Sequence, residues 1–197
     1  MDASGPAGVV AVVEEGQIIR SVEFGGGRSR GGGAAAAIEQ MADEDGLHGV
    51  VVGRGPGSYT GLRSSIASAW GFSLGRGIPL CGVSSLLALA PGEYFAVGDA
   101  RRGQFYFAHI DQGCFVSEPV LVEKETLLAT IEGNPGMPLF VPSPTGLPNE
   151  TITSPRPEIL AALANFEKSS TDGLCLPIYL KPPHITTPSG QEAFRPV

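Results

Sequence analysis

The residues best suited to chemistry form a glycine-rich turn, Gly55-Pro56-Gly57-Ser58-Tyr59-Thr60-Gly61-Leu62-Arg63, which follows the apolar run Val50 to Val52. Main-chain N–H groups at a strand-to-helix turn attract anions, so such a turn can bind phosphate. The glycines lack the G-x-G-x-x-G spacing, however, and no lysine stands where a Walker A loop requires one. We favour a structural turn in which Ser58 or Thr60 caps a helix and Pro56 stiffens the entry, and we keep nucleotide binding as the alternative.

The sequence lacks the residues that other kinds of catalytic site require. The three histidines, His48, His109 and His184, are far apart and show no metal-binding spacing. Ser58 fits the Gly-x-Ser-x-Gly pattern of hydrolases only if one glycine is shifted. The three cysteines are odd in number and contain no Cys-x-x-Cys pair, which argues against a disulfide framework and a structural zinc site. We therefore predict no catalytic residue, no metal and no cofactor.

The composition narrows the class of protein. The chain has 197 residues, a formal net charge of -7 and a sequence pI near 4.9. Because phosphate neutralisation needs clustered lysine and arginine, we expect the chain alone to bind nucleic acid poorly and to reach RNA only through a basic partner. No apolar run is long enough to cross a bilayer, and no signal peptide opens the chain, so we expect a cytoplasmic protein without a membrane partner.

The hydrophobic pattern predicts an α/β protein with two lobes. In the first lobe, residues 1–92, strands are expected at 9–13, 17–24, 48–53 and 78–83, and helices at 34–44, 60–74 and 84–89. In the second lobe, residues 93–197, strands are expected at 94–97, 104–110, 114–122 and 138–141, and helices at 124–131 and 157–166. We expect the tail from residue 182 to be extended or mobile.

The helix at 60–74 has almost no charge. No ionisable side chain lies between Arg63 and Arg76, so this helix has no side built for water. We expect its own sheet to cover one stripe and a second polypeptide to cover another. The sequence leaves open whether the partner contacts Ile66 and Trp70 or the opposite stripe, Ser65, Ala69 and Phe72. The alanine-rich helix adds four candidate interface residues, which are Ala34, Ala37, Ile38 and Met41.

The glycine-rich turn also carries a family resemblance. Together with Gly77-Ile78-Pro79-Leu80 and Gly82-Val83-Ser84-Ser85-Leu86, it resembles the signature of the TsaB family, also called YeaZ. Two further blocks, Val97 to Tyr106 and Pro177 to Lys181, are similar to an Asp-Ala-Arg-Arg-Gly turn and a C-terminal segment of that family.

The resemblance implies a fold and a function. The fold is the two-lobed actin-like ATPase fold (ASKHA, ribonuclease H-like). The function is that of a non-catalytic subunit required for N6-threonylcarbamoyladenosine (t6A) at adenosine 37 of tRNAs that read ANN codons. The partners implied are a TsaD-type catalytic subunit, which binds helices of the first lobe, a TsaE-type ATPase, and a second copy of the chain when it is alone. Transfer RNA is met only indirectly.

Two features bear on this expectation. Family members begin with an apolar strand that ends in Asp-Thr-Ser, and Met1-Asp2-Ala3-Ser4 resembles only its end. We therefore expect the fold to lack most of its first strand and the recorded start to lie inside the gene product. In the second lobe we expect Asp99, Arg101 and Arg102 to form a structural turn with an arginine paired to a carboxylate. The alternative is an ATPase or small-molecule kinase that uses Asp2, Asp99 and the glycine-rich turn.

Overall fold

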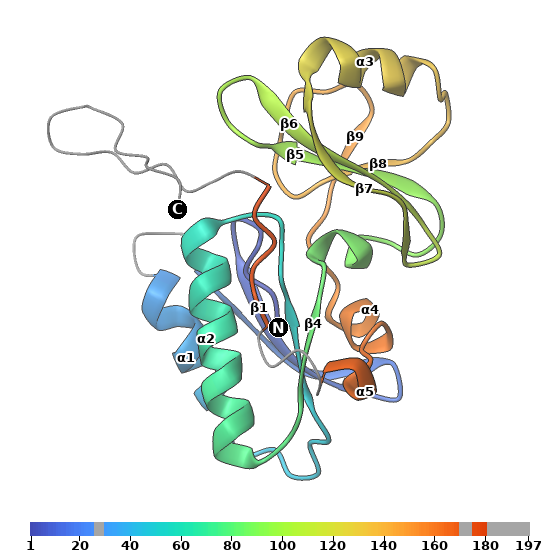
Figure 1. Ribbon diagram of the computed structural model, residues 1–197. Coiled ribbons are helices and arrows are strands. Elements are labelled where there is room, and N and C mark those ends of the chain that lie inside the picture. Colours follow the sequence, from blue (N-terminus) through green and yellow to red (C-terminus); the bar gives the residue numbers. More distant parts are fainter. Residues whose placement is uncertain (26–29, 170–174, 181–197) are drawn as a thin grey trace, which may run out of the picture.

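A computed structural model describes residues 1–25, 30–169 and 175–180 of the chain, and the expected mobile tail lies outside these residues. The elements form two groups, one above the other in Figure 1. The lower group contains short β-sheets with helices on both sides, and the upper group is a larger sheet with one helix. The mixed α/β class predicted from the sequence is confirmed.

The first group is built from two strand pairs. Strands β1 (Gly8–Glu14) and β2 (Gln17–Phe24) form an antiparallel hairpin, and β3 (Val50–Gly53) pairs in parallel with β4 (Leu80–Val83). Residues 1–4 lie between the two pairs. The main chain of Asp2 exchanges hydrogen bonds of 2.9 and 2.8 Å with Val9, and that of Met1 bonds to β3 at Val51 and Gly53. The N-terminal residues thus join the two pairs into one layer.

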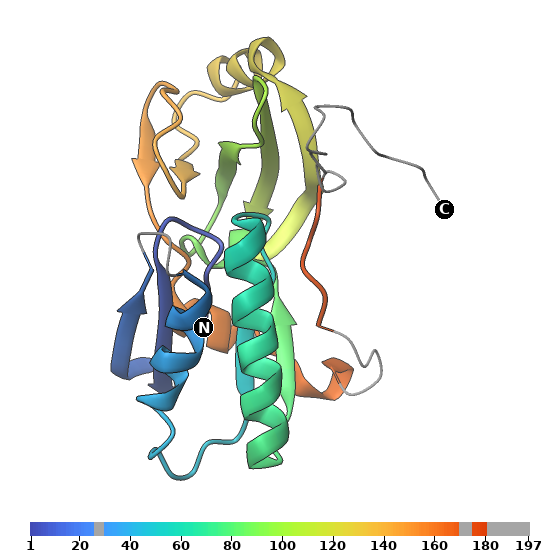
Figure 2. The ribbon, with the colours of Figure 1, turned by 90° about the vertical axis from the view of Figure 1, so that its left-hand side faces the viewer.

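Helices cover both faces of this layer. Helices α1 (Arg30–Glu39) and α2 (Tyr59–Arg76) lie side by side on one face, where Ala34, Ile38 and Ile66 share a core with Val52 of β3 (Figure 2). Helices α4 (Pro157–Ala162) and α5 (Phe166–Ser169) cover the other face. There Leu160 is buried with Cys81 and Val83 of β4.

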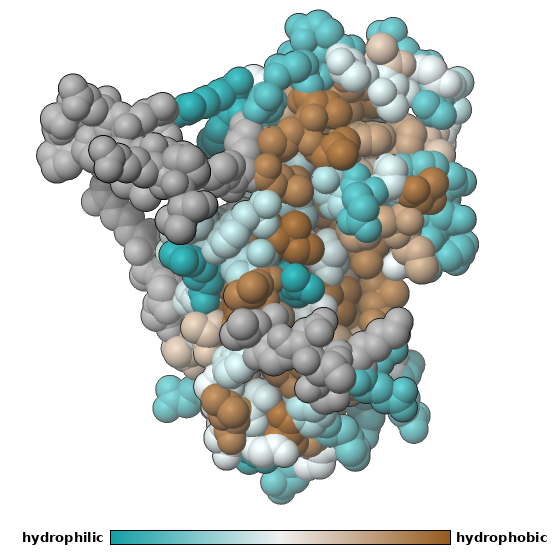
Figure 3. All heavy atoms as spheres, viewed as in Figure 1, coloured by the Kyte–Doolittle hydropathy of each residue, from teal (hydrophilic) through white to brown (hydrophobic). Residues whose placement is uncertain are grey.

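The second group is a five-stranded sheet in the order β7-β6-β5-β8-β9. Its strands are β5 (Tyr94–Asp99), β6 (Gln104–Asp111), β7 (Cys114–Glu123), β8 (Leu139–Val141) and β9 (Glu150–Ile152). Helix α3 (Lys124–Glu132) covers one face through the buried Leu127. The other face packs against the 3-10 helix η1 (Ser85–Ala88) and leaves Phe115, Leu121 and Phe140 half-buried. Figure 3 shows hydrophobic side chains gathered over this sheet on the face it draws.

Most of the predicted elements are present, and three differ. The single helix predicted at 157–166 is two helices, because α4 ends at Ala162 and α5 begins at Phe166. The helix predicted at 34–44 begins earlier and ends at Glu39. Strand β9 was not predicted, since three residues are too few for a periodic signal. The division at residue 92 stays a prediction, and the structure places 157–169 with the elements of the first group.

Two glycines of α2 provide a matched test of this packing. A Cβ at Gly61 would lie 2.4 Å from the carbonyl oxygen of Ala3, whereas a Cβ at Gly71 would meet nothing within 4 Å. We expect Gly61→Ala to lower the free energy of unfolding by about 2 kcal/mol or more, because main-chain atoms cannot move aside cheaply. Gly71→Ala should raise it by about 0.5–1 kcal/mol through helix propensity. Urea unfolding of both variants measures the difference, and equal effects would contradict the packing described here.

Candidate functional site

The glycine-rich turn is a tightly packed structural turn. Ser58 is the N-cap of α2, and its hydroxyl accepts a hydrogen bond of 3.3 Å from Gly61 N. Ser58 N donates to the carbonyl oxygen of Ser4 at 2.8 Å, and a Cβ on Gly57 would lie 2.3 Å from that oxygen. Gly55 has φ of 87°, in the left-handed region. The glycines are therefore explained by the close passage of residues 3–4 and by backbone geometry, and Ser58 provides the cap.

The side chain of Asp2 lies at the centre of this turn. It is 2% exposed, and its Oδ1 accepts hydrogen bonds from Ser4 N at 2.8 Å and from Ser4 Oγ at 2.6 Å. Its Oδ2 accepts from Ser85 Oγ at 2.5 Å, and Ser85 Oγ in turn accepts from Gly55 N at 2.9 Å. A Cβ on Gly53 would lie 1.7 Å from Oδ2, so only glycine fits there. The carboxylate connects the N-terminal residues, the turn and η1.

The contacts of Asp2 bear on the alternative that the chain is an ATPase or small-molecule kinase. Both oxygens of Asp2 are engaged by donors of the chain itself. Asp99 is exposed, and its Oδ1 accepts from Arg101 N at 2.6 Å while its Oδ2 lies 3.7 Å from the Arg101 guanidinium. Arg101 thus pairs with a nearby carboxylate, in agreement with the expectation from the sequence. Arg101 and Arg102 both have positive φ in this tight turn.

Tyr106 of β6 lies within electrostatic range of both carboxylates. Burial raises the pKa of Tyr106, and the negative charges of Asp2 and Asp99 raise it further. A Cβ on Gly98 would lie 2.1 Å from its hydroxyl oxygen, so the ring covers β5 at that point. The phenol therefore stays neutral and unreactive as a base at physiological pH.

The described residues contain no metal site, and the cavity beside the turn is small. No group of three His, Cys, Asp or Glu side chains that could hold a metal occurs in residues 1–25, 30–169 and 175–180. A cavity beside the turn, lined by Ala3, Gly5, Pro6, Gly8, Phe24, Gly25 and Gly61, has a volume of about 10 Å³. This volume holds about one water molecule and no nucleotide. Within the same ranges, no helix is long and apolar enough to span a membrane.

The predicted interface residues require a correction. Seven of the nine are buried in the core of this chain, so they form no surface that a partner can reach; they are Ala34, Ala37, Ile38, Met41, Ser65, Ile66 and Ala69. Trp70 and Phe72 are half-buried against the same core. The physical reason is that α1 packs on α2, and the small residues permit this close approach within the chain. Neither stripe proposed from the sequence is the open one.

The open side of α2 is a different stripe. We define the open stripe as Ala67, Gly71, Leu74 and Gly75, which are all exposed. Leu74 is 71% exposed, the largest value among the exposed large hydrophobic residues of the described chain. The open stripe is apolar or small throughout. The residues of the open stripe recur every three to four positions, as one side of a helix requires. Because every other side of α2 also lacks charged residues, the sequence alone could not show which side is exposed.

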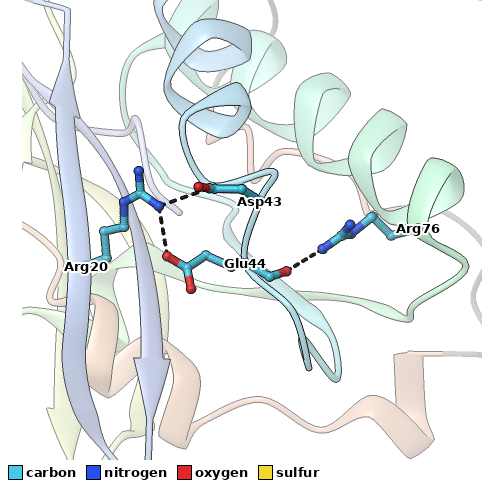
Figure 4. Close-up of polar contacts among 4 residues, drawn as sticks. All are labelled: Arg20, Asp43, Glu44 and Arg76. Atoms are coloured by element: carbon cyan, nitrogen blue, oxygen red, sulfur yellow. Dashed lines mark hydrogen bonds and ion pairs between the residues drawn. The ribbon is translucent and has the colours of Figure 1, made fainter.

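A polar cluster fixes the far end of α2. Arg20 of β2 lies 3.0 Å from Asp43 and 2.9 Å from Glu44, and Arg76 at the end of α2 donates to the carbonyl oxygen of Glu44 (Figure 4). These contacts hold the connection between α1 and β3 against both β2 and α2. The helices α1 and α2 are thereby kept in one orientation relative to the sheet.

The C-terminal segment 175–180 runs from the first group to the second across the turn. Ile178 N donates to the carbonyl oxygen of Arg54 at 2.8 Å, and Arg54 Nε donates to the carbonyl oxygen of Leu176 at 2.6 Å. The rings of Tyr179 and Tyr59 lie 5.3 Å apart, and Leu180 packs against the core of the second sheet. Residues 177–180 of the block that resembles the family's C-terminal segment therefore cross both groups, and Lys181 lies outside the described residues.

Solved structures share this fold. YeaZ from Pseudomonas aeruginosa matches with a TM-score of 0.68 and 23% sequence identity, over 91% of this chain and 97% of that one. A second Pseudomonas aeruginosa structure, described as similar to peptidase YEAZ, matches with a TM-score of 0.67. The chain thus has the two-lobed actin-like ATPase fold expected from the sequence.

Sequence comparisons identify the family. Residues 34–133 match the family model described as TsaD, tRNA N6-adenosine threonylcarbamoyltransferase. An uncharacterized protein of Mycobacterium bovis is 34% identical over 157 residues, which cover 76% of this chain and 70% of the relative. The tRNA threonylcarbamoyladenosine biosynthesis protein TsaB of Escherichia coli is 40% identical over 70 residues. The chain belongs to the TsaB (YeaZ) family.

The extent of these matches varies. The chain spans 33% of an uncharacterized protein of Mycobacterium leprae, at 38% identity over 118 residues, and 30% of the Escherichia coli TsaB. The part that these two relatives share with the chain is therefore about a third of their length.

The central carboxylate gives a prediction for the site. Ser85→Ala removes the donor to Asp2 Oδ2 and the acceptor for Gly55 N. We expect the free energy of unfolding to fall by about 2 kcal/mol, because a buried charge loses a hydrogen bond and a buried N–H loses its acceptor. Ser68→Ala on α2, a half-buried serine outside this network, is the matched control and should change it little. Denaturant unfolding compares them, and a Ser85→Ala variant as stable as the parent would show that the network adds no stability.

Proposed function

We propose that this chain is a non-catalytic subunit of the machinery that makes t6A in tRNA, and that it acts by docking onto a TsaD-type catalytic subunit. The observation that carries the proposal is the open stripe of α2, an exposed apolar surface in a member of the TsaB family. Relatives of the chain in three bacteria are named tRNA threonylcarbamoyladenosine biosynthesis protein TsaB. The substrate class, tRNAs that read ANN codons, follows from the same family.

The open stripe is suited to helix packing. Small residues at Ala67, Gly71 and Gly75 allow the main chain of a second helix to come close, and Leu74 supplies a side chain to insert. From Ala67 to Gly75 the helix extends about 12 Å, long enough for two turns of a partner helix to lie against it. Since no charge lies on this length, docking desolvates no ionised group of α2.

The chemistry of the turn supports a scaffold role. A nucleotide-hydrolysing site needs carboxylates free to hold a metal and main-chain N–H groups free to hold phosphates. Asp2 accepts hydrogen bonds from Ser4 and Ser85, and Gly55 N and Gly61 N donate to serine hydroxyls. We infer that the residues a kinase would use hold the fold together instead.

Further partners follow from the same proposal. In the absence of the catalytic subunit, we expect the open stripe to pair with a second copy, in a homodimer weaker than the pairing with a TsaD-type protein. A TsaE-type ATPase would join the assembled pair. Transfer RNA would meet the chain within that complex, because the net charge of -7 disfavours binding by the chain alone.

Reconstitution tests the function directly. Purified TsaD-type and TsaE-type proteins are supplied with ATP, the threonylcarbamoyl adenylate and unmodified tRNA, with and without this chain, and t6A is measured by mass spectrometry. We expect t6A only when the chain is present, and no ATP hydrolysis by the chain alone. Modification that proceeds without the chain, or nucleotide turnover by the chain unaided, would contradict the proposal.

The docking surface gives its own prediction. Leu74→Asp should weaken binding of the TsaD-type protein at least about tenfold, since it places a charge in an apolar interface. It should leave folding intact, because Leu74 is 71% exposed. Val116→Asp, on β7 and 58% exposed, is the matched control and should bind normally. Calorimetric titration measures both affinities, and equal affinities would place the interface elsewhere.

A further inference from the structure

The stretch around the glycine-rich turn is positive in an acidic chain. No carboxylate side chain occurs between Asp45 and Glu93, whereas the whole chain has a net charge of -7. Arg54 precedes the turn and Arg63 follows it. In the described part of the chain, neither arginine pairs with a carboxylate. The turn is therefore bordered by two arginines that form no ion pair within the described residues, and the nearby carboxylate of Asp2 is buried and bonded to Ser4 and Ser85.

Two exposed tyrosines lie beside Arg63, and Arg54 holds the C-terminal segment that carries one of them. The rings of Tyr59 and Tyr179 have centroids 5.3 Å apart with planes inclined by 32°, and the Arg63 guanidinium carbon lies 4.7 Å from the centroid of Tyr59. Tyr59 is 41% exposed and Tyr179 is 42% exposed. The contact covers part of each ring and leaves a large aromatic surface open to solvent. We call Arg54, Tyr59, Arg63 and Tyr179 the aromatic platform.

Holding the C-terminal segment does not account for the platform. Two hydrogen bonds at Arg54 already attach residues 176 and 178, and Leu180 packs against the second sheet. A segment held in this way needs no exposed, inclined tyrosine pair. Burial of the rings would fix it more strongly, because apolar area removed from water is what stabilises packing.

The combination of groups indicates the occupant. An acidic protein surface would match the arginines but not the open aromatic rings, and an apolar one would match the rings but not the arginines. An unpaired nucleotide of RNA has both a flat π-face, which stacks on tyrosine, and a phosphate, which pairs with arginine. We propose that the aromatic platform stacks an unpaired base of the RNA substrate while Arg54 and Arg63 contact its phosphates.

This inference rests on the proposed function, and it assigns the chain a direct contact with RNA inside the complex. It differs from the expectation that tRNA is met only indirectly, which followed from the total charge. The platform is a local exception within a negative surface. Its contribution therefore appears when a catalytic partner supplies the rest of the RNA contacts.

The test uses the complex of this chain with a TsaD-type protein. A fluorescein-labelled RNA stem–loop with an unpaired anticodon loop is titrated with the complex, and fluorescence anisotropy gives the dissociation constant over a salt series. Tyr179→Ala should weaken binding about fivefold or more, and Tyr179→Phe, which keeps the ring, should bind as the parent does. Arg63→Gln should weaken binding and reduce the slope of log affinity against log salt by about one.

Two control measurements show whether the variants are folded and still bind the TsaD-type protein. Melting temperature and affinity for the TsaD-type protein should match those of the parent, because both side chains are exposed. If Tyr179→Ala lowers that protein affinity and not the RNA affinity, the surface docks protein and the inference is overturned. Competition by saturating ATP against the labelled RNA would likewise overturn it, since a free nucleotide would then be the ligand.

The outcomes separate the two proposals. If the parent complex makes t6A but Tyr179→Ala and Arg63→Gln bind RNA as it does, the platform inference fails and the proposed function stands. If the parent complex makes no t6A, the proposed function fails. Loss of RNA affinity in Tyr179→Ala with recovery in Tyr179→Phe supports the platform.

Discussion

The buried carboxylate of Asp2 is the constraint on which the rest of this structure depends. Taking a charge out of water is costly unless donors replace the water, and here Ser4 and Ser85 supply them. To reach the carboxylate, residues 1–4 must pass against the turn, which leaves no room for side chains at Gly53, Gly57 and Gly61. The glycines at positions 53, 57 and 61 and the position of η1 follow from this one group.

Helix α2 is fixed at both of its ends, by different contacts. At its N-terminus the helix is fixed to the turn, and at its C-terminus Arg76 holds the connection to β3 through Glu44. Between these ends α1 covers one side of α2, and the open stripe remains uncovered. A helix fixed at both ends presents a rigid surface, which reduces the entropy that docking must overcome. In the docking role that we propose, this rigidity would favour binding of the partner.

The sequence predicted the elements well because their signals are local. The β-branched runs 9–13 and 17–24, joined by Glu14-Glu15-Gly16, predict a hairpin, and the structure has it. The turn and its helix were also predicted, and of the two candidate caps, Ser58 and Thr60, it is Ser58 that caps the helix. What could not be predicted depends on contacts between distant residues. The open side of α2 is decided by where α1 packs, and the stacking of Tyr179 on Tyr59 by the path of the C-terminal segment.

The central claim is that the open side of α2 is covered by a second polypeptide when the protein works. Hydrogen–deuterium exchange of the chain, alone and with a TsaD-type protein, tests it most directly. We expect slower exchange in peptides that cover residues 64–76, and unchanged exchange in β6 and β7. Protection of the second sheet with none in α2, or no protection anywhere at saturating partner, would contradict it.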